Sequence, residues 1–264
     1  MKKPKKISGT REWAVSTINI CDGCTNGCRY CYARQMAVRF GRIKCDKEWE
    51  IQTIRDKEFN KIRTKRQGTI MFPSAHDISE ETLPQFMEVL GKLLRAGNTV
   101  LVVSKPKPSY ITAICKRFEA FKSTLLFRFT IGAYKARILE YWDPHAPTYR
   151  ERLQSLQVAF KNGFNTSVSV EPMLDSFNVE KLFYKLEPFV TDTIWIGKLN
   201  KIRERVHIET DEDEKQVAKI EAGQTDERVQ AIYAALKDEP KIRWKESFKE
   251  VLGLETATEA GLDV

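Results

Sequence analysis

The chain has 264 residues, of which 42% are apolar, and this length and composition fit one large α/β domain or two small ones. Four of its six cysteines fall between positions 21 and 31, unlike the dispersed cysteines of a short secreted disulfide framework. No stretch approaches the roughly 18 apolar residues of a transmembrane helix, and the basic start lacks the apolar segment of a signal peptide. We therefore expect a soluble protein of a reducing compartment, the cytoplasm, with no membrane contact.

The net charge of +8 is distributed unevenly along the chain. Residues 201–264 contain 11 basic and 16 acidic residues and carry −5, so residues 1–200, with 33 basic and 20 acidic residues, carry +13. A basic surplus on one part of a chain is typical of proteins with an anionic partner, and nucleic acid is the usual one. The alternative is a lysine-rich surface that is only solvated.

Apolar runs typical of buried strands alternate with helical patterns over the first 200 residues. The expected strands are 13–20, 99–105, 124–132, 165–174 and 191–200, together with 69–77, which begins as a strand and runs into a turn. The expected helices are 32–40, 83–97, 109–121, 146–163 and 179–190. Strands that are each followed by a helix pair in parallel through right-handed crossovers, which predicts an α/β fold and a partial (β/α)6 barrel. An open doubly wound sheet is the alternative.

The pattern changes after residue 200. The acidic run "ETDEDEK" (209–215) indicates an exposed loop or an insertion, and 226–237 and 241–254 have amphipathic helical patterns. We therefore expect a barrel over 1–200 and a C-terminal helical extension over 201–264 that packs on it. "IRWKESF" (242–248) could present basic side chains to a substrate, or form a packed helix with a solvated basic face.

The four clustered cysteines are Cys21, Cys24, Cys28 and Cys31. Structural zinc sites usually separate two C-x2-C pairs by a finger-length segment, whereas only three residues separate the pairs here. A 4Fe–4S cluster fits better, because it presents several irons to one short loop. The spacing of the last three cysteines suits three irons and leaves the fourth open, and the loop follows the first expected strand, at the end of a (β/α) barrel that carries active sites.

The segment Cys24-Thr-Asn-Gly-Cys28-Arg-Tyr30-Cys31 resembles the C-x3-C-x-aromatic-C signature of the radical S-adenosylmethionine superfamily. The resemblance extends to about residue 200, and "LVVSK", "HAPTYRERLQSLQVAFKNGF" and "VSVEPML" look most like the spore photoproduct lyase-like branch. It implies that these three cysteines hold a 4Fe–4S cluster, and that S-adenosylmethionine binds the open iron and is reductively cleaved to a 5′-deoxyadenosyl radical. Cys21 lies outside the signature, and its simplest interpretation is a small buried residue at a strand end.

The resemblance also implies where S-adenosylmethionine makes its other contacts. The lyase-like branch uses a tyrosine after the last cysteine, a serine after the second strand and a lysine ending the third strand. Tyr32, Ser74 and Lys105 match these positions, with His76 and Asp77 as alternatives to Ser74. On the fourth strand we expect Thr130 to reach the ribose, with Arg128 as its rival. Further cofactor contacts are expected from the fifth and sixth strands, at Val170, Glu171, Trp195 and Ile196.

Candidate catalytic side chains are Tyr30 and Tyr32, which could relay a hydrogen atom, and His76, which could transfer a proton. Glu171 ends the fifth strand, where its carboxylate could bind substrate or hold an arginine. One departure is clear: spore photoproduct lyases carry a hydrogen-donor cysteine near the position of Pro73, and this strand has no cysteine. The departure counts against thymine-dimer reversal by the lyase mechanism.

The expected function is hydrogen abstraction from a nucleic-acid base or nucleotide by a monomeric enzyme that receives electrons from a flavodoxin or ferredoxin. A radical enzyme that modifies a peptide or protein is an alternative, although the last 64 residues hold no cysteine for an auxiliary cluster. An alternative of another class is a non-catalytic iron–sulfur or zinc protein that binds nucleic acid. The sequence shows no helix-turn-helix or RNA-binding signature in its support.

Overall fold

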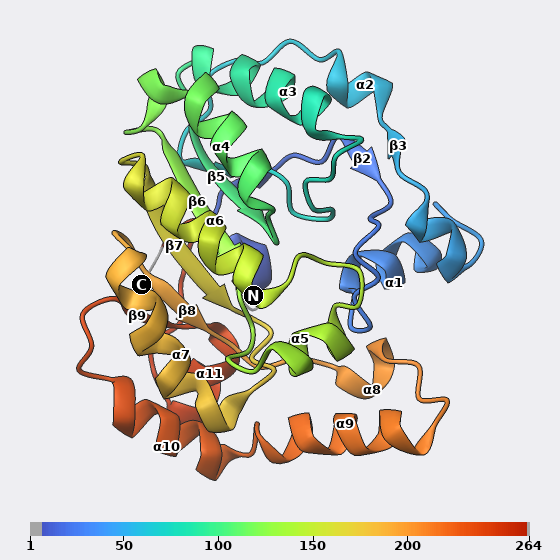
Figure 1. Cartoon of the computed structure of the whole chain (residues 1–264), viewed down its shortest axis with the longest axis vertical. Coiled ribbons are helices and arrows are strands. Elements are labelled where there is room, and N and C mark those ends of the chain that lie inside the picture. Colours follow the sequence, from blue (N-terminus) through green and yellow to red (C-terminus); the bar gives the residue numbers. More distant parts are fainter. Residues whose placement is uncertain (1–6, 263–264) are drawn as a thin grey trace, which may run out of the picture.

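A computed structural model describes residues 7–262. Its main sheet has the strand order β1-β4-β5-β6-β7-β8-β9, and every neighbouring pair is parallel. The sheet curls into a half-barrel (Figure 1), so the predicted partial α/β barrel is confirmed. In that order the strands span Ser16–Thr17, Thr69–Met71, Thr99–Ser104, Leu125–Thr130, Asn165–Val170, Ile194–Ile196 and Ile242–Trp244. A separate antiparallel pair consists of β2 (Cys21–Asp22) and β3 (Thr53–Ile54).

Helices that follow the strands cover the outer face of the sheet (Figure 1). They include α3 (Leu83–Arg95), α4 (Pro108–Arg117), α6 (Tyr149–Lys161) and α7 (Val179–Leu186). The remaining α-helices are α1 (Tyr32–Arg39), α2 (Asp56–Phe59), α5 (Ala136–Trp142), α8 (Ile202–Arg205), α9 (Asp211–Ala222), α10 (Asp226–Leu236) and α11 (Glu246–Leu252). Short 3-10 turns lie at Gly9–Glu12, Asp46–Glu50, Glu119–Phe121, Ser176–Asn178 and Glu187–Phe189.

The strands divide the core into two parts. Val100 and Val102 of β5 pack in one large buried cluster with Leu90 of α3, whereas Leu101 between them packs with Trp195 on the other face. Successive strand residues point to opposite faces, so β5 is buried on both sides. The first cluster joins the sheet to its helices. The second fills the concave side and forms the floor beneath the strand ends.

Residues 241–254 differ from the single helix that the sequence predicts. Residues 242–244 form β9, which pairs with β8 through Ile194 and Ile242, and α11 begins only at Glu246. Ile242 and Trp244 are buried and alternate with Arg243, but this period of two is too short to stand out from the helical pattern that follows it. The C-terminal section therefore supplies the seventh parallel strand of the barrel, so the predicted boundary at residue 200 does not separate the sheet from the extension.

The acidic run 209–215 also differs from its prediction, because most of it is helical. Thr210 and Asp213 form a reciprocal capping box at the start of α9, and the first turn of the helix contains four acidic residues. Negative side chains in a first helical turn interact favourably with the helix dipole, so the charge run stabilises a helix rather than a loop.

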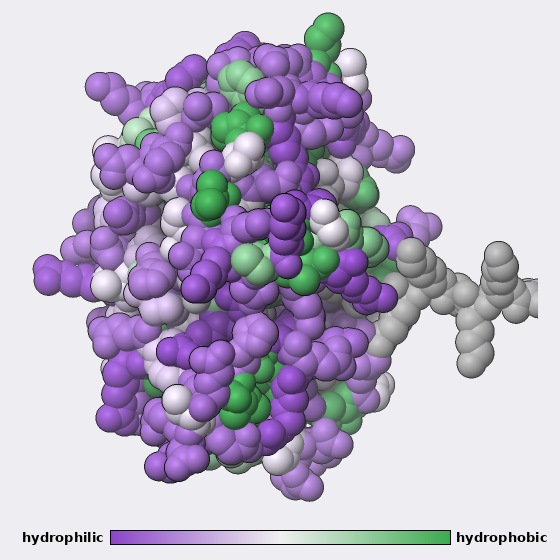
Figure 2. Space-filling model, turned by 90° about the vertical axis from the view of Figure 1, so that its right-hand side faces the viewer, coloured by the Kyte–Doolittle hydropathy of each residue, from purple (hydrophilic) through white to green (hydrophobic). Residues whose placement is uncertain are grey.

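The surface of the half-barrel is predominantly polar in the view of Figure 2, where apolar side chains occur in small separated groups. Within residues 7–262, none of the helices has the length and apolar character that crossing a membrane requires.

Candidate active site

The cysteine loop runs from β2 to the start of α1. Cys31 is the N-cap residue of α1, and its Sγ accepts the backbone N–H of Arg34 at 3.4 Å. Cys24 and Cys28 are buried, and Cys31 is partly exposed. Gly27 has φ +61°, and a Cβ there would lie 2.7 Å from a histidine ring, so the turn requires glycine. The turn gathers the three cysteines at one end of the barrel.

This loop closes one side of a cavity of about 510 Å³ at the carboxyl ends of β4, β5, β6 and β7. The volume is within the range of small-molecule sites. The cavity brings together most of the residues that the sequence singles out. Those that line it are Tyr30, Tyr32, Ser74, His76, Lys105, Thr130, Glu171 and the three cysteines Cys24, Cys28 and Cys31.

Asp77 and Lys105 form the charged centre of the lining. The Asp77 carboxylate accepts hydrogen bonds from the Asn26 amide at 2.8 Å, the Ser104 hydroxyl at 2.8 Å and the Lys105 backbone N–H at 2.6 Å. Its Oδ2 also lies 3.5 Å from Lys105 Nζ. Burial opposes ionisation, but Lys105 keeps the pKa of Asp77 below its ordinary value and Asp77 raises the pKa of Lys105 well above its own. Both groups are therefore charged, and the ammonium is held at the cavity wall.

Tyr32 and Ser74 are in contact in the same lining. The Tyr32 hydroxyl donates to the carbonyl oxygen of Ser74. Asn19 fixes the same turn, because its Oδ1 accepts the N–H of Ser74 at 2.8 Å and its Nδ2 donates to the Ser74 hydroxyl at 2.9 Å. The turn after β4 is therefore locked to both β1 and α1, and Ser74 keeps its hydroxyl proton available for a ligand.

His76 lines the cavity but is engaged by the main chain. Its Nε2 accepts the N–H of Ile20 at 3.3 Å, and its Nδ1 lies 3.1 Å from the carbonyl oxygen of Asp77, to which it donates. Burial lowers its pKa, so the imidazole is neutral, consistent with one donor and one acceptor nitrogen. These contacts hold the turn after β4, and proton transfer by His76 stays a prediction.

Glu171 forms an ion pair with a lysine of the C-terminal section. Lys245 is 1% exposed, and its Nζ lies 2.7 Å from Glu12, 3.4 Å from Glu171 and 4.1 Å from the centre of the Trp13 ring. Burial raises the pKa of Glu171 in spite of Lys245. This contact joins the N-terminal turn, β7 and the C-terminal section beneath the cavity wall.

Four predicted cofactor contacts lie outside the cavity lining: Arg128, Val170, Trp195 and Ile196. Arg128 is buried one layer below, where it donates to Ser167 at 2.8 Å and lies over the rings of Trp13 and Trp195 at 4.9 and 5.4 Å. Val170 and Ile196 belong to the cluster that packs against the helices. These four side chains therefore do not line the cavity, and their contact with a cofactor stays a prediction.

The polar groups of the lining fit a polar ligand. Trp13 Nε1, Ser169 Oγ and Arg205 Nε are buried and have no hydrogen-bond partner within residues 7–262, and all three residues line the cavity. Unpaired buried polar atoms are rare in native proteins, so a ligand with donors and acceptors would satisfy them. Arg205 is not predicted from the sequence because α8 is too short to show a pattern.

The three cysteines line one cavity but do not surround a single point. No three side chains of the types His, Cys, Asp and Glu in the described part of the chain converge as they would around one metal ion. A zinc site needs such convergence, whereas each thiolate of a 4Fe–4S cluster binds its own iron. Burial raises the pKa of the Cys24 thiol to about 12, so this thiol is protonated at neutral pH and would lose its proton on binding any metal.

Comparisons with known proteins support the fold. No model of a known protein family matches the chain. The chain is 23% identical over 188 residues to the uncharacterized protein MJ0683 of Methanocaldococcus jannaschii, which covers 70% of each protein. The structure of the present chain is similar to that of HydG, a maturase of the [FeFe]-hydrogenase, with a TM-score of 0.50 and 12% identity over 91% of this chain. The chain spans 59% of the HydG chain. Neither protein is described as a spore photoproduct lyase, so that finer resemblance stays a prediction.

Proposed function

We propose that the chain is a radical S-adenosylmethionine enzyme that holds a 4Fe–4S cluster at Cys24, Cys28 and Cys31. The observation that carries this proposal is the convergence of one short cysteine loop, Tyr32 and Lys105 on a single cavity at the strand ends of a half-barrel. When bound there, the reduced cluster and S-adenosylmethionine would supply a 5′-deoxyadenosyl radical for hydrogen abstraction.

The surrounding side chains are suited to hold that cofactor. The Lys105 ammonium, fixed by Asp77, can bind the carboxylate of the methionine part, and Arg205 offers a second cation at the same cavity. The Ser74 hydroxyl and Thr130 can hydrogen-bond the amine and the ribose. Cys24 and Cys28 are buried, which would limit the exposure of a cluster held there to solvent.

A nucleic-acid base or nucleotide is the substrate class that we propose. Its support is the +13 charge of residues 1–200 and three cationic residues in the cavity lining besides Lys105, namely Arg11, Lys198 and Arg205. The lining contains no fourth cysteine, so Tyr30 and Tyr32 are the lining side chains that could return a hydrogen atom. The lyase-like branch remains part of this proposal, with that difference in the hydrogen donor.

The test is anaerobic reconstitution with iron and sulfide, reduction, addition of S-adenosylmethionine and quantification of 5′-deoxyadenosine by mass spectrometry. The wild type should form the product, and Cys31→Ala should not. Cys21→Ala is the matched control, because Cys21 is a buried neighbour that does not line the cavity, and it should retain activity. Added DNA, RNA and nucleotide pools would then be compared with peptide pools for stimulation. Absence of product from the wild type in the presence of every pool would contradict the proposal.

A further inference from the structure

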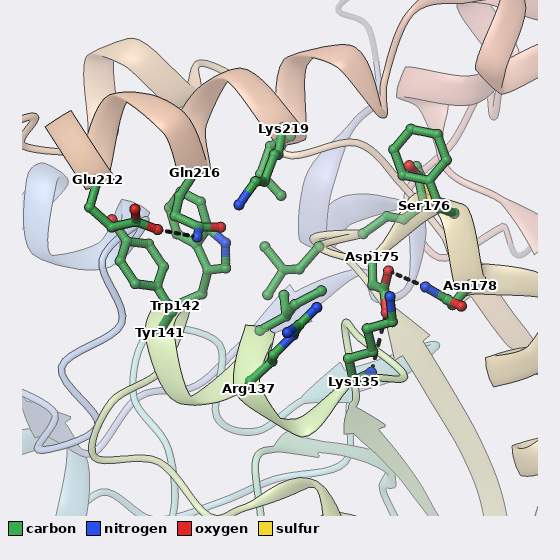
Figure 3. Close-up of a pocket in the computed structure, with 15 residues that line it drawn as sticks. Lys135, Arg137, Tyr141, Trp142, Asp175, Ser176, Asn178, Glu212, Gln216 and Lys219 are labelled. Atoms are coloured by element: carbon green, nitrogen blue, oxygen red, sulfur yellow. Dashed lines mark hydrogen bonds between the residues drawn. The ribbon is translucent and has the colours of Figure 1, made fainter.

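A second cavity, of about 550 Å³, lies between α5, the segment 173–178 after β7, and α9 (Figure 3). None of its lining residues lines the cysteine cavity. One of its walls is shared with the cysteine loop, because Arg29 donates to the carbonyl oxygens of Tyr141 at 2.8 Å and Trp142 at 2.9 Å. The cavity is therefore separate from the proposed active site but adjacent to its cysteine loop.

Two cations extend into this cavity from opposite walls. Figure 3 shows the guanidinium of Arg137, on α5, and the ammonium of Lys219, on α9, entering the space between the two helices. Both side chains belong to exposed residues, and no ion pair within residues 7–262 involves either of them. Arg203 on α8, which is also exposed, is by contrast paired with two glutamates. The cavity thus contains positive charge that the fold does not neutralise.

The two carboxylates of the lining, Asp175 and Glu212, form no ion pair with these cations in the part of the chain that the structure describes, and they are fewer than the three cations Lys135, Arg137 and Lys219, so the lining keeps a net positive charge. Asp175 accepts the backbone N–H of Lys135 at 3.2 Å and the amide of Asn178 at 2.8 Å. Glu212 accepts the amide of Gln216 at 2.6 Å. An anionic group of a ligand is therefore the natural partner of the two cations.

The same cavity offers aromatic surface beside the cations. Phe177 lines the cavity and is 66% exposed, and the Arg228 guanidinium carbon lies 5.3 Å from its ring centre. Trp142 also lines the cavity but is fully buried. An exposed aromatic ring next to basic side chains is the combination that proteins use to stack a base and bind its phosphate. The volume is also sufficient for a ligand of that size.

We propose that this cavity binds a nucleoside phosphate, with the phosphate between Arg137 and Lys219 and the base against Phe177. The nucleotide could be free or part of a single strand, because either source presents the same chemistry. The inference does not depend on the proposed radical chemistry, since it uses no residue of the cysteine cavity.

The test measures equilibrium binding of adenosine 5′-monophosphate and of a fluorescein-labelled single-stranded oligonucleotide of about 12 nucleotides to the full chain. Arg137→Ala/Lys219→Ala should weaken binding at least about tenfold, because each charged hydrogen bond contributes more than a neutral one. Phe177→Ala should weaken it several-fold. The matched control is Arg150→Ala/Lys215→Ala, which removes the same two residue types at exposed positions outside the cavity and should change binding less than about twofold.

The probes distinguish the two sources and include a result that overturns the proposal. Binding of the mononucleotide supports a free ligand, and binding of the oligonucleotide alone supports a strand, provided that both weaken in Arg137→Ala/Lys219→Ala. Inorganic phosphate that binds as tightly as the nucleotide would refute the role of the base. Equal weakening in Arg137→Ala/Lys219→Ala and in the control would show only general attraction to a basic surface, and no binding of any probe would refute the site. All variants replace exposed side chains, and thermal unfolding monitored by circular dichroism would verify that they fold.

Discussion

Replacing Asp77 by asparagine removes the charge that holds three neighbouring segments together. The carboxylate accepts hydrogen bonds from the cysteine loop at Asn26, from Ser104 and from the backbone of Lys105, and it lies 3.5 Å from the Lys105 ammonium. The side chains of Asp77 and Lys105 are 15% and 12% exposed. Removing one partner of a fully buried pair costs about 3–5 kcal/mol, and the residual exposure places Asp77→Asn near the lower end, about 3 kcal/mol.

The assay is equilibrium urea unfolding of the apoprotein, followed by circular dichroism, at one pH and salt concentration. Asp46→Asn is the control, because Asp46 pairs with Arg34 at the surface, where an ion pair contributes about 0–1 kcal/mol. A double-mutant cycle with Lys105→Met isolates the interaction between the two side chains. We expect the double variant to lose about 1–3 kcal/mol less unfolding free energy than the two single variants lose together. Additive losses, or a loss in Asp77→Asn no larger than in Asp46→Asn, would refute the reasoning.

Two further changes test contacts that join distant parts of the chain. Gly197→Ala would place a Cβ 2.8 Å from Lys245 Cγ, so we expect it to lower the free energy of unfolding by about 1–3 kcal/mol, and an unchanged urea midpoint would contradict that packing. Asp213 accepts hydrogen bonds from Tyr141 and from Arg29. The bond from Tyr141 is the main cause that lowers the pKa of Asp213 to about 2. Because the pKa of Asp213 in the folded state lies below its ordinary value, the carboxylate stabilises the fold fully above about pH 4. This stabilisation is lost as the pH falls towards 2. The stability gap between wild type and Asp213→Asn should therefore narrow on acidification, and a gap independent of pH between 7 and 3 would contradict it.

Much of the fold could be predicted because buried parallel strands are recorded locally in the sequence. The run "TVLVVSK" is apolar on both faces and ends at proline, and it forms β5 at 99–104. β9 escaped prediction because three residues carry too little periodicity, and its stability comes from pairing with β8 rather than from its own pattern. The acidic run of α9 escaped because the capping box at Thr210 outweighs the general association of charge runs with loops.

The residues of the site likewise differ in how well the local sequence predicts their position. Cys24, Cys28, Cys31 and Tyr32 occupy one short segment, and Lys105 directly follows a strand, so local sequence placed them. The spacing of residues along a strand, however, predicts which face of the sheet a side chain lies on, but not how far it lies from the strand end that borders the cavity. Residues two positions apart are separated by about 7 Å along the strand, so Thr130 lines the cavity while Arg128 lies below it.

Residues from the ends of the chain could not be placed by pattern at all. Lys245 contacts Glu12 across 233 positions of sequence, and neither segment carries a signal that points to the other. Arg205 reaches the cavity from a helix of four residues. Such contacts follow from how the sheet closes, which brings η1 (Gly9–Glu12) together with the start of α11.

The most direct test of the account is the metal content of the anaerobically reconstituted chain and its cysteine variants, measured by elemental analysis with acid-labile sulfide. The account predicts about four irons per chain in the wild type and in Cys21→Ala, and loss of the cluster in Cys24→Ala, Cys28→Ala and Cys31→Ala. Zinc in place of iron, or a cluster lost in Cys21→Ala and retained in Cys31→Ala, would contradict it.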